Sequence, residues 1–230
     1  MISRFGLVRR KDGMDDETFL NYWRKIHGPM AAKLPDLRNY YQNWITNADQ
    51  VGVDHPRGQW DLDGFSELQF DTVQAMLDAL ESPEFPPTVE DVDKFLGQVR
   101  LIVCDKNVVV PRPTVDDGPV KKRISLLKRR PDVTPEQFKE EWLGKHAELV
   151  SKWPGVLGYN QNLVIDRYAT MAETTDYDAV PVDGLVEFWF RTEEEVEGLF
   201  QTDQVKETQA HAYEFISEIT TFFVEETKIF

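Results

Sequence analysis

The sequence is poor in cysteine and in long hydrophobic runs. Its single cysteine, Cys104, excludes an intrachain disulfide and lies in an apolar run, where we expect a small buried side chain. No run of about 18 apolar residues occurs, so the sequence predicts no membrane-spanning helix. The N-terminus enters a strand-like run without an apolar leader, and we therefore expect a cytoplasmic protein with no membrane partner.

Positive charge is scarce as well. The chain has 26 Lys and Arg residues against 41 Asp and Glu residues, which gives a formal net charge of −15 at pH 7. An acidic surface of this kind repels nucleic-acid phosphates and anionic lipids, so we expect no nucleic-acid partner and no lipid partner.

Motifs that hold metals or cofactors are missing too. There are no paired cysteines and no HExxH, so the sequence predicts no metal site. There is no GxGxxG or Walker loop for a nucleotide, and no GxSxG elbow for a serine nucleophile. We therefore expect a protein that works without a cofactor.

What the sequence does contain is an internal repeat. Two aromatic residues and a histidine, spaced i, i+4 and i+8, recur 119 residues later, and the two sets are Phe19, Trp23, His27 and Phe138, Trp142, His146. Residues four apart lie one above another on a helix, so each set forms one stripe. Further pairs keep the same order, and we infer two domains, 1–111 and 119–230, joined by a proline-rich linker at 112–118.

Each copy predicts the element order β-α-β-β-α-β. The expected strands are 4–10, 39–46, 64–70 and 100–110, then 123–129, 158–165, 184–190 and 221–230. The expected helical regions are 15–27 and 72–98, then 134–151 and 192–218. Asp15 and Thr134 are the expected N-caps of the first helices, and Gly28-Pro29 is expected to end the helix of the first copy.

This element order is that of a ferredoxin-like unit, whose sheet carries helices on one face only. The other face is apolar and must be covered, which two copies in one chain achieve by packing their sheets together. We therefore predict an α+β fold, in which two ferredoxin-like β-α-β-β-α-β repeats form an intramolecular dimeric α+β barrel with helices outside.

His27 and His146 are the leading catalytic candidates. Each recurs where a stripe leaves the aromatic core and approaches the end of an element, a usual place for a pocket, and histidine moves protons near neutral pH. The alternative is a partly buried histidine that hydrogen-bonds a carbonyl and completes the packing.

Two strand positions supply further candidates. Glu67 and Glu187 stand mid-strand between bulky residues, where a glutamate is costly unless it is paired or faces a cavity. A salt bridge to Arg4 or Arg123 on another strand, or a polar patch inside the barrel, is the structural alternative, and we rank structural pairing above a role as general base.

Tyr40 and Tyr159 begin the second strand of each copy, with Gln42 and Gln161 on the same face. A phenol and an amide on one face can orient a carbonyl or lactone substrate, and a cross-strand polar ladder is the alternative. His55 lies in a loop of the first copy and would favour that copy if only one site were active. It and His211 are otherwise expected at the surface, as most lone histidines are.

The combined pattern resembles the EthD domain family of the dimeric α+β barrel superfamily. It consists of Phe19-x3-Trp23-x3-His27-Gly-Pro29, Tyr40-x-Gln42-Asn43 and Asp63-Gly64-x2-Glu67-x2-Phe70. The second copy shows it through Trp142, His146, Tyr159-x-Gln161-Asn162 and Asp183-Gly184-x2-Glu187. The resemblance implies single-domain relatives that pair as dimers, and a relative that isomerises methylmuconolactone with a helix histidine and a strand tyrosine. It implies His27 with Tyr40, and His146 with Tyr159, as the equivalent pairs, and His55 as a loop histidine of the site.

The sequence thus predicts a cofactor-free isomerase or dehydratase acting in catabolism on a small cyclic, lactone or aromatic substrate. The histidine would be the acid/base, the tyrosine would orient the substrate, and the glutamate would hold the histidine or share its proton. The expected substrate contacts are Trp23, Gln42, His55, Trp142 and Gln161. A non-catalytic small-molecule-binding or accessory protein, and a haem- or O2-dependent oxidoreductase, are the alternatives. The sequence leaves open whether the fused chain forms a homodimer.

Overall fold

The computed structural model describes residues 1–230, the side chain of Val115 excepted. The first half contains β1 Ile2–Arg10, α1 Asp16–Tyr22, a π-helical turn Trp23–His27, α2 Gly28–Ala31, β2 Asn39–Asn47, β3 Gly64–Phe70, α3 Val73–Glu81, α4 Phe85–Val92 and β4 Leu96–Val110. The second half contains β5 Lys121–Arg129, α5 Pro135–Glu141, a π-helical turn Trp142–His146, α6 Ala147–Ser151, β6 Gly158–Tyr168, β7 Gly184–Phe190, α7 Glu193–Leu199, α8 Asp203–Ala212 and β8 Ile216–Lys228. A short 3-10 turn, Val115–Asp117, lies between the halves.

The eight strands form one closed antiparallel barrel in the order β1-β3-β2-β8-β5-β7-β6-β4. Two seams join the halves: β2 pairs with β8, with Trp44 opposite Glu225, and β4 pairs with β6, with Cys104 opposite Val164. The α+β class and the closed barrel are therefore confirmed. Closure leaves no free sheet edge, and it covers the apolar face that each half would otherwise expose.

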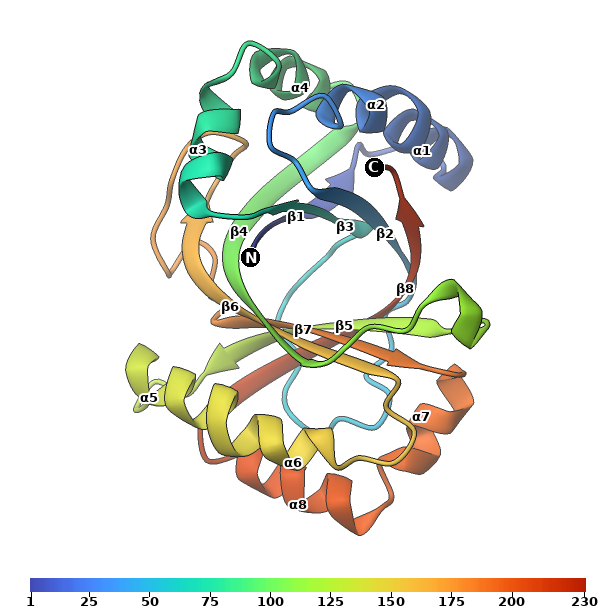
Figure 1. Cartoon of the computed structure of the whole chain (residues 1–230), viewed down its shortest axis with the longest axis vertical. Helices are drawn as coiled ribbons and strands as arrows, with labels where there is room; N and C mark the ends of the chain where they lie inside the picture. Colours follow the sequence, from blue (N-terminus) through green and yellow to red (C-terminus); the bar gives the residue numbers. More distant parts are fainter.

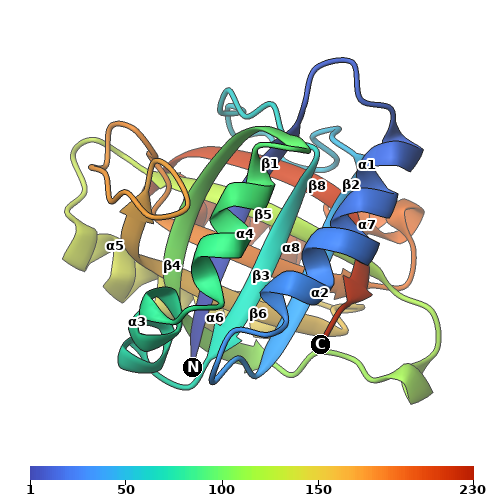
Figure 2. The same ribbon diagram turned by 90° about the horizontal axis from the view of Figure 1, so that it is seen from above.

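Helices cover the outside of the barrel in two layers, α1–α4 on the first half and α5–α8 on the second (Figure 1). Seen from above, α1, α2 and α4 lie across the strands of the first half (Figure 2). Side chains alternate along each strand, so Ile124 and Leu126 of β5 pack inside the barrel while Leu127 packs under the helices. Cys104 is fully buried inside the barrel, as expected. Among the described helices, none is long and apolar enough to cross a membrane.

The two predicted N-caps are confirmed. The Asp15 side chain accepts from the Thr18 amide, and Thr134 forms a capping box with Gln137. The prediction that Gly28-Pro29 ends the first helix is wrong, because the chain turns through Trp23–His27 as a π helix and continues into α2. Proline fits there because it stands in the first turn of the new helix, where its missing N–H costs no hydrogen bond.

The second helical region is broken in both halves. Prolines explain the break between α3 and α4, as the sequence indicated. The second half breaks without proline after Leu199, which differs from the single region expected at 192–218. Thr202 starts α8 in an extended conformation, so the two halves keep the same pair of short helices by different local means.

The long loops between the second and third strands cross from one half to the other. Figure 1 shows the cyan loop 48–63 of the first half lying against the helices of the second, and the orange loop 169–183 beside α3. In the first crossing, Gln50 accepts from the Thr221 amide at 3.3 Å, and the Gln209 side chain donates to the Gly52 carbonyl at 2.8 Å. In the second, Arg4 Nη2 donates to the Met171 carbonyl at 2.5 Å. Each half therefore supplies a cover for the other.

Candidate functional site

A cavity of about 60 Å³ lies between sheet and helices in the second half. Its polar lining includes His146 at the end of the π turn, Tyr159 on β6 and Arg123 on β5. Apolar residues make most of its wall: Val53, Leu127, Val150, Trp153, Val186, Phe188, Phe200, Ala212, Ile216 and Ile219. An apolar enclosure with a few convergent polar groups is the usual form of a small-molecule site.

His146 begins a chain of titratable side chains that ends at the protein surface. Its Nδ1 lies 3.4 Å from Nδ1 of His211, and Nε2 of His211 lies 3.1 Å from a Glu141 oxygen. The Glu141 side chain is 46% exposed, so the chain connects the cavity to solvent. With both rings neutral, His211 donates to Glu141 and His146 donates to His211, which leaves the His146 Nε2 lone pair for the cavity.

Burial is the main influence on the charge of this histidine. Burial, with smaller contributions of the same sign from the neighbouring His211 and His55, lowers the pKa of His146 to about 3. The imidazole is therefore neutral near pH 7, which is the form that accepts a proton.

The first half has an equivalent cavity of about 30 Å³, lined by Arg4, His27 and Tyr40 among others. There the histidine is held by a carboxylate: His27 Nδ1 lies 3.1 Å from Asp91, which also accepts from the Tyr22 hydroxyl. Burial lowers the pKa of His27, while Asp91 opposes that effect.

The tyrosines are fully buried in both cavities. Burial raises the pKa of Tyr40 to about 12 and raises that of Tyr159 as well, so both phenols are neutral and can act as hydrogen-bond donors. Each lines the cavity of its own half together with the helix histidine. The structure thus brings together the two histidine–tyrosine pairs that the sequence singled out.

The glutamines and tryptophans of the predicted site hold the helix on the sheet. Gln42 donates to the Trp23 carbonyl at 2.9 Å, and Gln161 donates to the Trp142 carbonyl at 2.6 Å. Trp23 lines the first cavity, but Trp142, Gln42 and Gln161 line neither. These contacts fix the start of each π turn, and so the position of the histidine four residues later.

His55 lies in the cavity of the second half, which corrects the expectation that it would favour the first. Its loop crosses the seam, and its ring stacks on Tyr213 at 3.9 Å between centroids. The expectation of a surface position for His55 and His211 is also wrong, since both are buried. His211 is buried because α8 packs it against the π turn, where it contacts His146. No local signal in the sequence indicates that a loop crosses to the other half.

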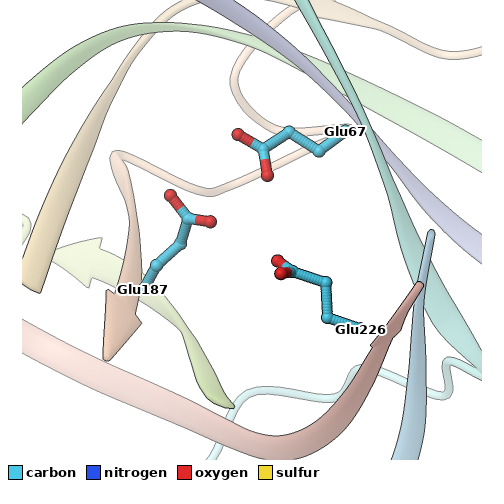
Figure 3. A group of neighbouring side chains, drawn as sticks. All are labelled: Glu67, Glu187 and Glu226. Atoms are coloured by element: carbon cyan, nitrogen blue, oxygen red, sulfur yellow. The ribbon is translucent and has the colours of Figure 1, made fainter. Parts of the chain in front are cut away.

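The predicted glutamates lie on the other face of the sheet, inside the barrel. Figure 3 shows Glu67, Glu187 and Glu226 pointing toward one another from three strands. Lys106 bridges Glu67 at 2.6 Å and Glu187 at 2.9 Å, and Lys122 bridges Glu187 at 2.7 Å and Glu226 at 2.6 Å. Because the ammonium groups already occupy the space between the carboxylates, we interpret the cluster as a buried ionic network.

This network corrects two further expectations. The salt-bridge partners of the glutamates are these lysines, and Arg4 and Arg123 point instead into the helix-side cavities. The glutamates do not hold the histidines, because the sheet separates the two groups. Burial alone would raise the pKa of Glu187, but the two lysines outweigh it and keep the carboxylate charged.

The fold and the cavities define a class: a closed α+β barrel with one histidine–tyrosine pocket in each half. The EthD domain model matches residues 11–98 and 130–218, so the chain belongs to the EthD family. No curated protein matches the chain. Among solved structures it is similar to an anthrone oxidase-like protein, with a TM-score of 0.65 and 8% identity over 99% of this chain and 93% of that one. A candidate monooxygenase from Lactobacillus acidophilus NCFM has a TM-score of 0.57 and 11% identity, over 99% and 94% of the chains. At these identities the likeness shows the fold alone.

Proposed function

We propose that this EthD-family chain is an enzyme that moves a proton on a small, largely apolar molecule, as a cofactor-free isomerase or dehydratase. The second-half cavity is the active site, and a cyclic, lactone or aromatic catabolite is the substrate class. In the same proposal each half is a ferredoxin-like repeat, and the barrel is a dimer fused into one chain with domains at 1–111 and 119–230.

The observation that supports this proposal is the connected path from His146 through His211 to Glu141. Isomerisation and dehydration release no net proton, because the proton returns to another atom of the substrate or leaves in the water that is formed. The path lets His146 exchange protons with solvent, so that the ring can return to its starting tautomer between turnovers. His146 acts as the acid/base at Nε2, and the Tyr159 hydroxyl donates to a substrate oxygen. His211 and Glu141 replace the glutamate that the sequence indicated as the partner of the histidine.

The test is turnover of a panel of small lactones and cyclic or aromatic acids in D2O, followed by proton NMR. His146→Gln should lower kcat/KM by at least about a hundredfold, since a general acid/base contributes on the order of 10² to 10⁴. His27→Gln is the matched variant and should keep most activity, and the double variant should be inactive. Unchanged turnover in folded His146→Gln protein would refute the proposal.

A non-catalytic binding protein is the second candidate, and the apolar wall of the cavity favours it. It predicts saturable binding without a product and without solvent deuterium in the recovered compound. The haem-dependent alternative does not fit these cavities, because a porphyrin is larger than any side chain and the two spaces have volumes of about 60 and 30 Å³.

A further inference from the structure

Arg123 is a buried cation whose partner is missing. Only 2% of the residue is exposed, and its Nε and Nη1 find no hydrogen-bond partner among the described residues. It stands on β5 two residues before Ser125, so the strand alternation directs both side chains into the second-half cavity. Such a group is costly to bury, since water no longer solvates its charge.

Nothing acidic in the cavity compensates this charge. The chain carries 41 Asp and Glu residues, yet the cavity lining contains neither type. The guanidinium stands over the rings of Phe200 and Phe223, at 5.1 and 5.9 Å. Aromatic faces attract a cation by roughly 0.5–2 kcal/mol, but they accept no N–H hydrogen bond of full strength.

Several polar groups near Arg123 can donate a hydrogen bond to a ligand. The Tyr159 and Ser125 hydroxyls line the cavity, and His55 has a buried Nε2 without a partner that donates in one of its two neutral tautomers. Burial lowers the pKa of Arg123 only to about 9, so its guanidinium stays charged at neutral pH. Among its described lining residues the cavity therefore offers one positive charge, two hydroxyl donors and the two histidines His55 and His146, and no negative group.

The equivalent arginine of the first half has one hydrogen-bond partner, although its Nε also lacks one. Arg4 is the counterpart of Arg123, and it donates to the Met171 carbonyl of the crossing loop at 2.5 Å. It also stands over the Tyr168 ring at 5.4 Å. In the second half the crossing loop brings His55 instead of a carbonyl acceptor.

We propose that the second-half cavity binds a small, mainly apolar molecule that carries a carboxylate, with the Arg123 guanidinium as its counter-ion. This inference rests on the proposed function and names the charge of its substrate. Arginine presents a planar fork that matches the two oxygens of a carboxylate, and such charge-assisted bonds are about twice as strong as neutral ones. The apolar wall, including Leu127 and Val186, selects an apolar body behind the charged group.

The proposal is tested by titrating the full chain with acetate and isobutyrate, whose size suits a cavity of about 60 Å³, measured by calorimetry and tryptophan fluorescence. The neutral isosteres acetamide and isobutyramide, and inorganic phosphate, are titrated in parallel. We expect saturable binding of at least one carboxylate, binding at least about tenfold weaker for its amide, and none for phosphate. Equal binding of acid and amide, or no binding of either carboxylate, would overturn the proposal.

Variants locate the anion site. Arg123→Met should abolish carboxylate binding, and Arg123→Lys should retain a weakened form, because it keeps the charge without the fork. Arg130→Met removes an exposed cation paired with Asp132 and should leave binding unchanged. Binding that survives in folded Arg123→Met protein, or that is lost in Arg4→Met instead, contradicts the assignment.

The two proposals fail separately. If carboxylate binding requires Arg123 but His146→Gln changes no turnover, the anion site stands and the catalytic proposal fails. If His146→Gln abolishes turnover while only neutral compounds bind, the catalytic proposal stands and the anion site fails.

Discussion

The two cavities occupy equivalent places in the barrel, yet different groups stand behind their histidines. His27 contacts Asp91, a carboxylate that holds the ring and favours its proton. In the second half His211 occupies the equivalent position. One of its ring nitrogens contacts His146, and the other contacts Glu141 at the surface. The difference indicates that duplication preserved the position of the histidine while its proton partner diverged.

The buried arginines and the crossing loops also differ between the two cavities. Arg4 donates one hydrogen bond to a loop carbonyl while its Nε has no partner, and its cavity is the smaller, at about 30 Å³ against about 60 Å³. Arg123 is not satisfied, and its cavity contains a second histidine from the crossing loop. We infer that the first half became a packed support and that the second half kept the working site.

The barrel interior also differs between the halves. Lys122 is buried and contacts Glu187 and Glu226, whereas the equivalent position in β1 is Ser3, which donates to Glu67. Lys122→Met should lower the free energy of unfolding by about 3–5 kcal/mol, because among the described residues it leaves Lys106 as the one interior lysine to balance the buried carboxylates Glu67 and Glu187. Urea denaturation followed by tryptophan fluorescence measures this change.

Lys121→Met is the matched control for that experiment. Lys121 is the neighbouring residue, its side chain is 49% exposed, and it lies 3.5 Å from Glu193. Its loss should change stability by less than about 1 kcal/mol, as for most surface pairs. Equal losses for the two lysines would show that the interior network does not support the fold.

The pH dependence of stability separates the two histidines. In the unfolded chain His146 becomes protonated below its ordinary pKa of 6.5, whereas in the folded chain it becomes protonated only near pH 3. The free energy of unfolding therefore falls as the pH is lowered from 6.5 to about 3. The slope from this residue is about 1.4 kcal/mol per pH unit. His146→Gln should remove it, and His27→Gln should remove less, because Asp91 opposes the effect of burial there. Stability curves between pH 4 and 7 that coincide for wild type and His146→Gln would contradict the buried neutral state.

These comparisons also show what the sequence could predict. The repeat and the strand alternation were enough for the α+β class and the closed barrel, because both depend on patterns within each copy. The π turns escaped detection, because they depend on contacts such as Gln42 to the Trp23 carbonyl, which join distant parts of the chain. Gly28-Pro29 misled the prediction for the same reason: a local stop signal was overridden by tertiary packing.

The site was only half accessible to sequence reasoning. The histidine–tyrosine pairs follow from spacing within one copy, and the structure places them together. Arg123 was considered only as an ion-pair partner, because the sequence of its strand does not show which of its two faces borders the cavity. His211 stands 120 residues after Asp91, the offset between the second halves of the two copies, and this spacing is a signal that could have identified both as partners of the helix histidines.

The two arginines should respond to substitution with opposite signs. Arg123→Met removes an unpaired buried charge and should raise the free energy of unfolding by about 1–2 kcal/mol, as apolar replacements of buried charges often do. Arg4→Met loses its hydrogen bond to the Met171 carbonyl and should lower it by about 1 kcal/mol. Thermal unfolding of both variants measures the signs, and destabilisation by Arg123→Met would mean that its charge already has a partner.

The crossing loops should differ in how they are held. The loop of the first half is pinned by the stacking of His55 on Tyr213, at 3.9 Å and 9° between the rings. Tyr213→Ala removes a contact of about 1 kcal/mol, since ring pairs contribute roughly 0.5–1.5 kcal/mol beyond their buried area. Amide hydrogen exchange should then become severalfold faster in loop 48–63, while loop 169–183, which crosses to the helices of the other half, serves as the internal control. Equal acceleration in both loops would mean that the variant loosens the whole barrel, whereas a change confined to the first loop would show that each cover opens independently of the other.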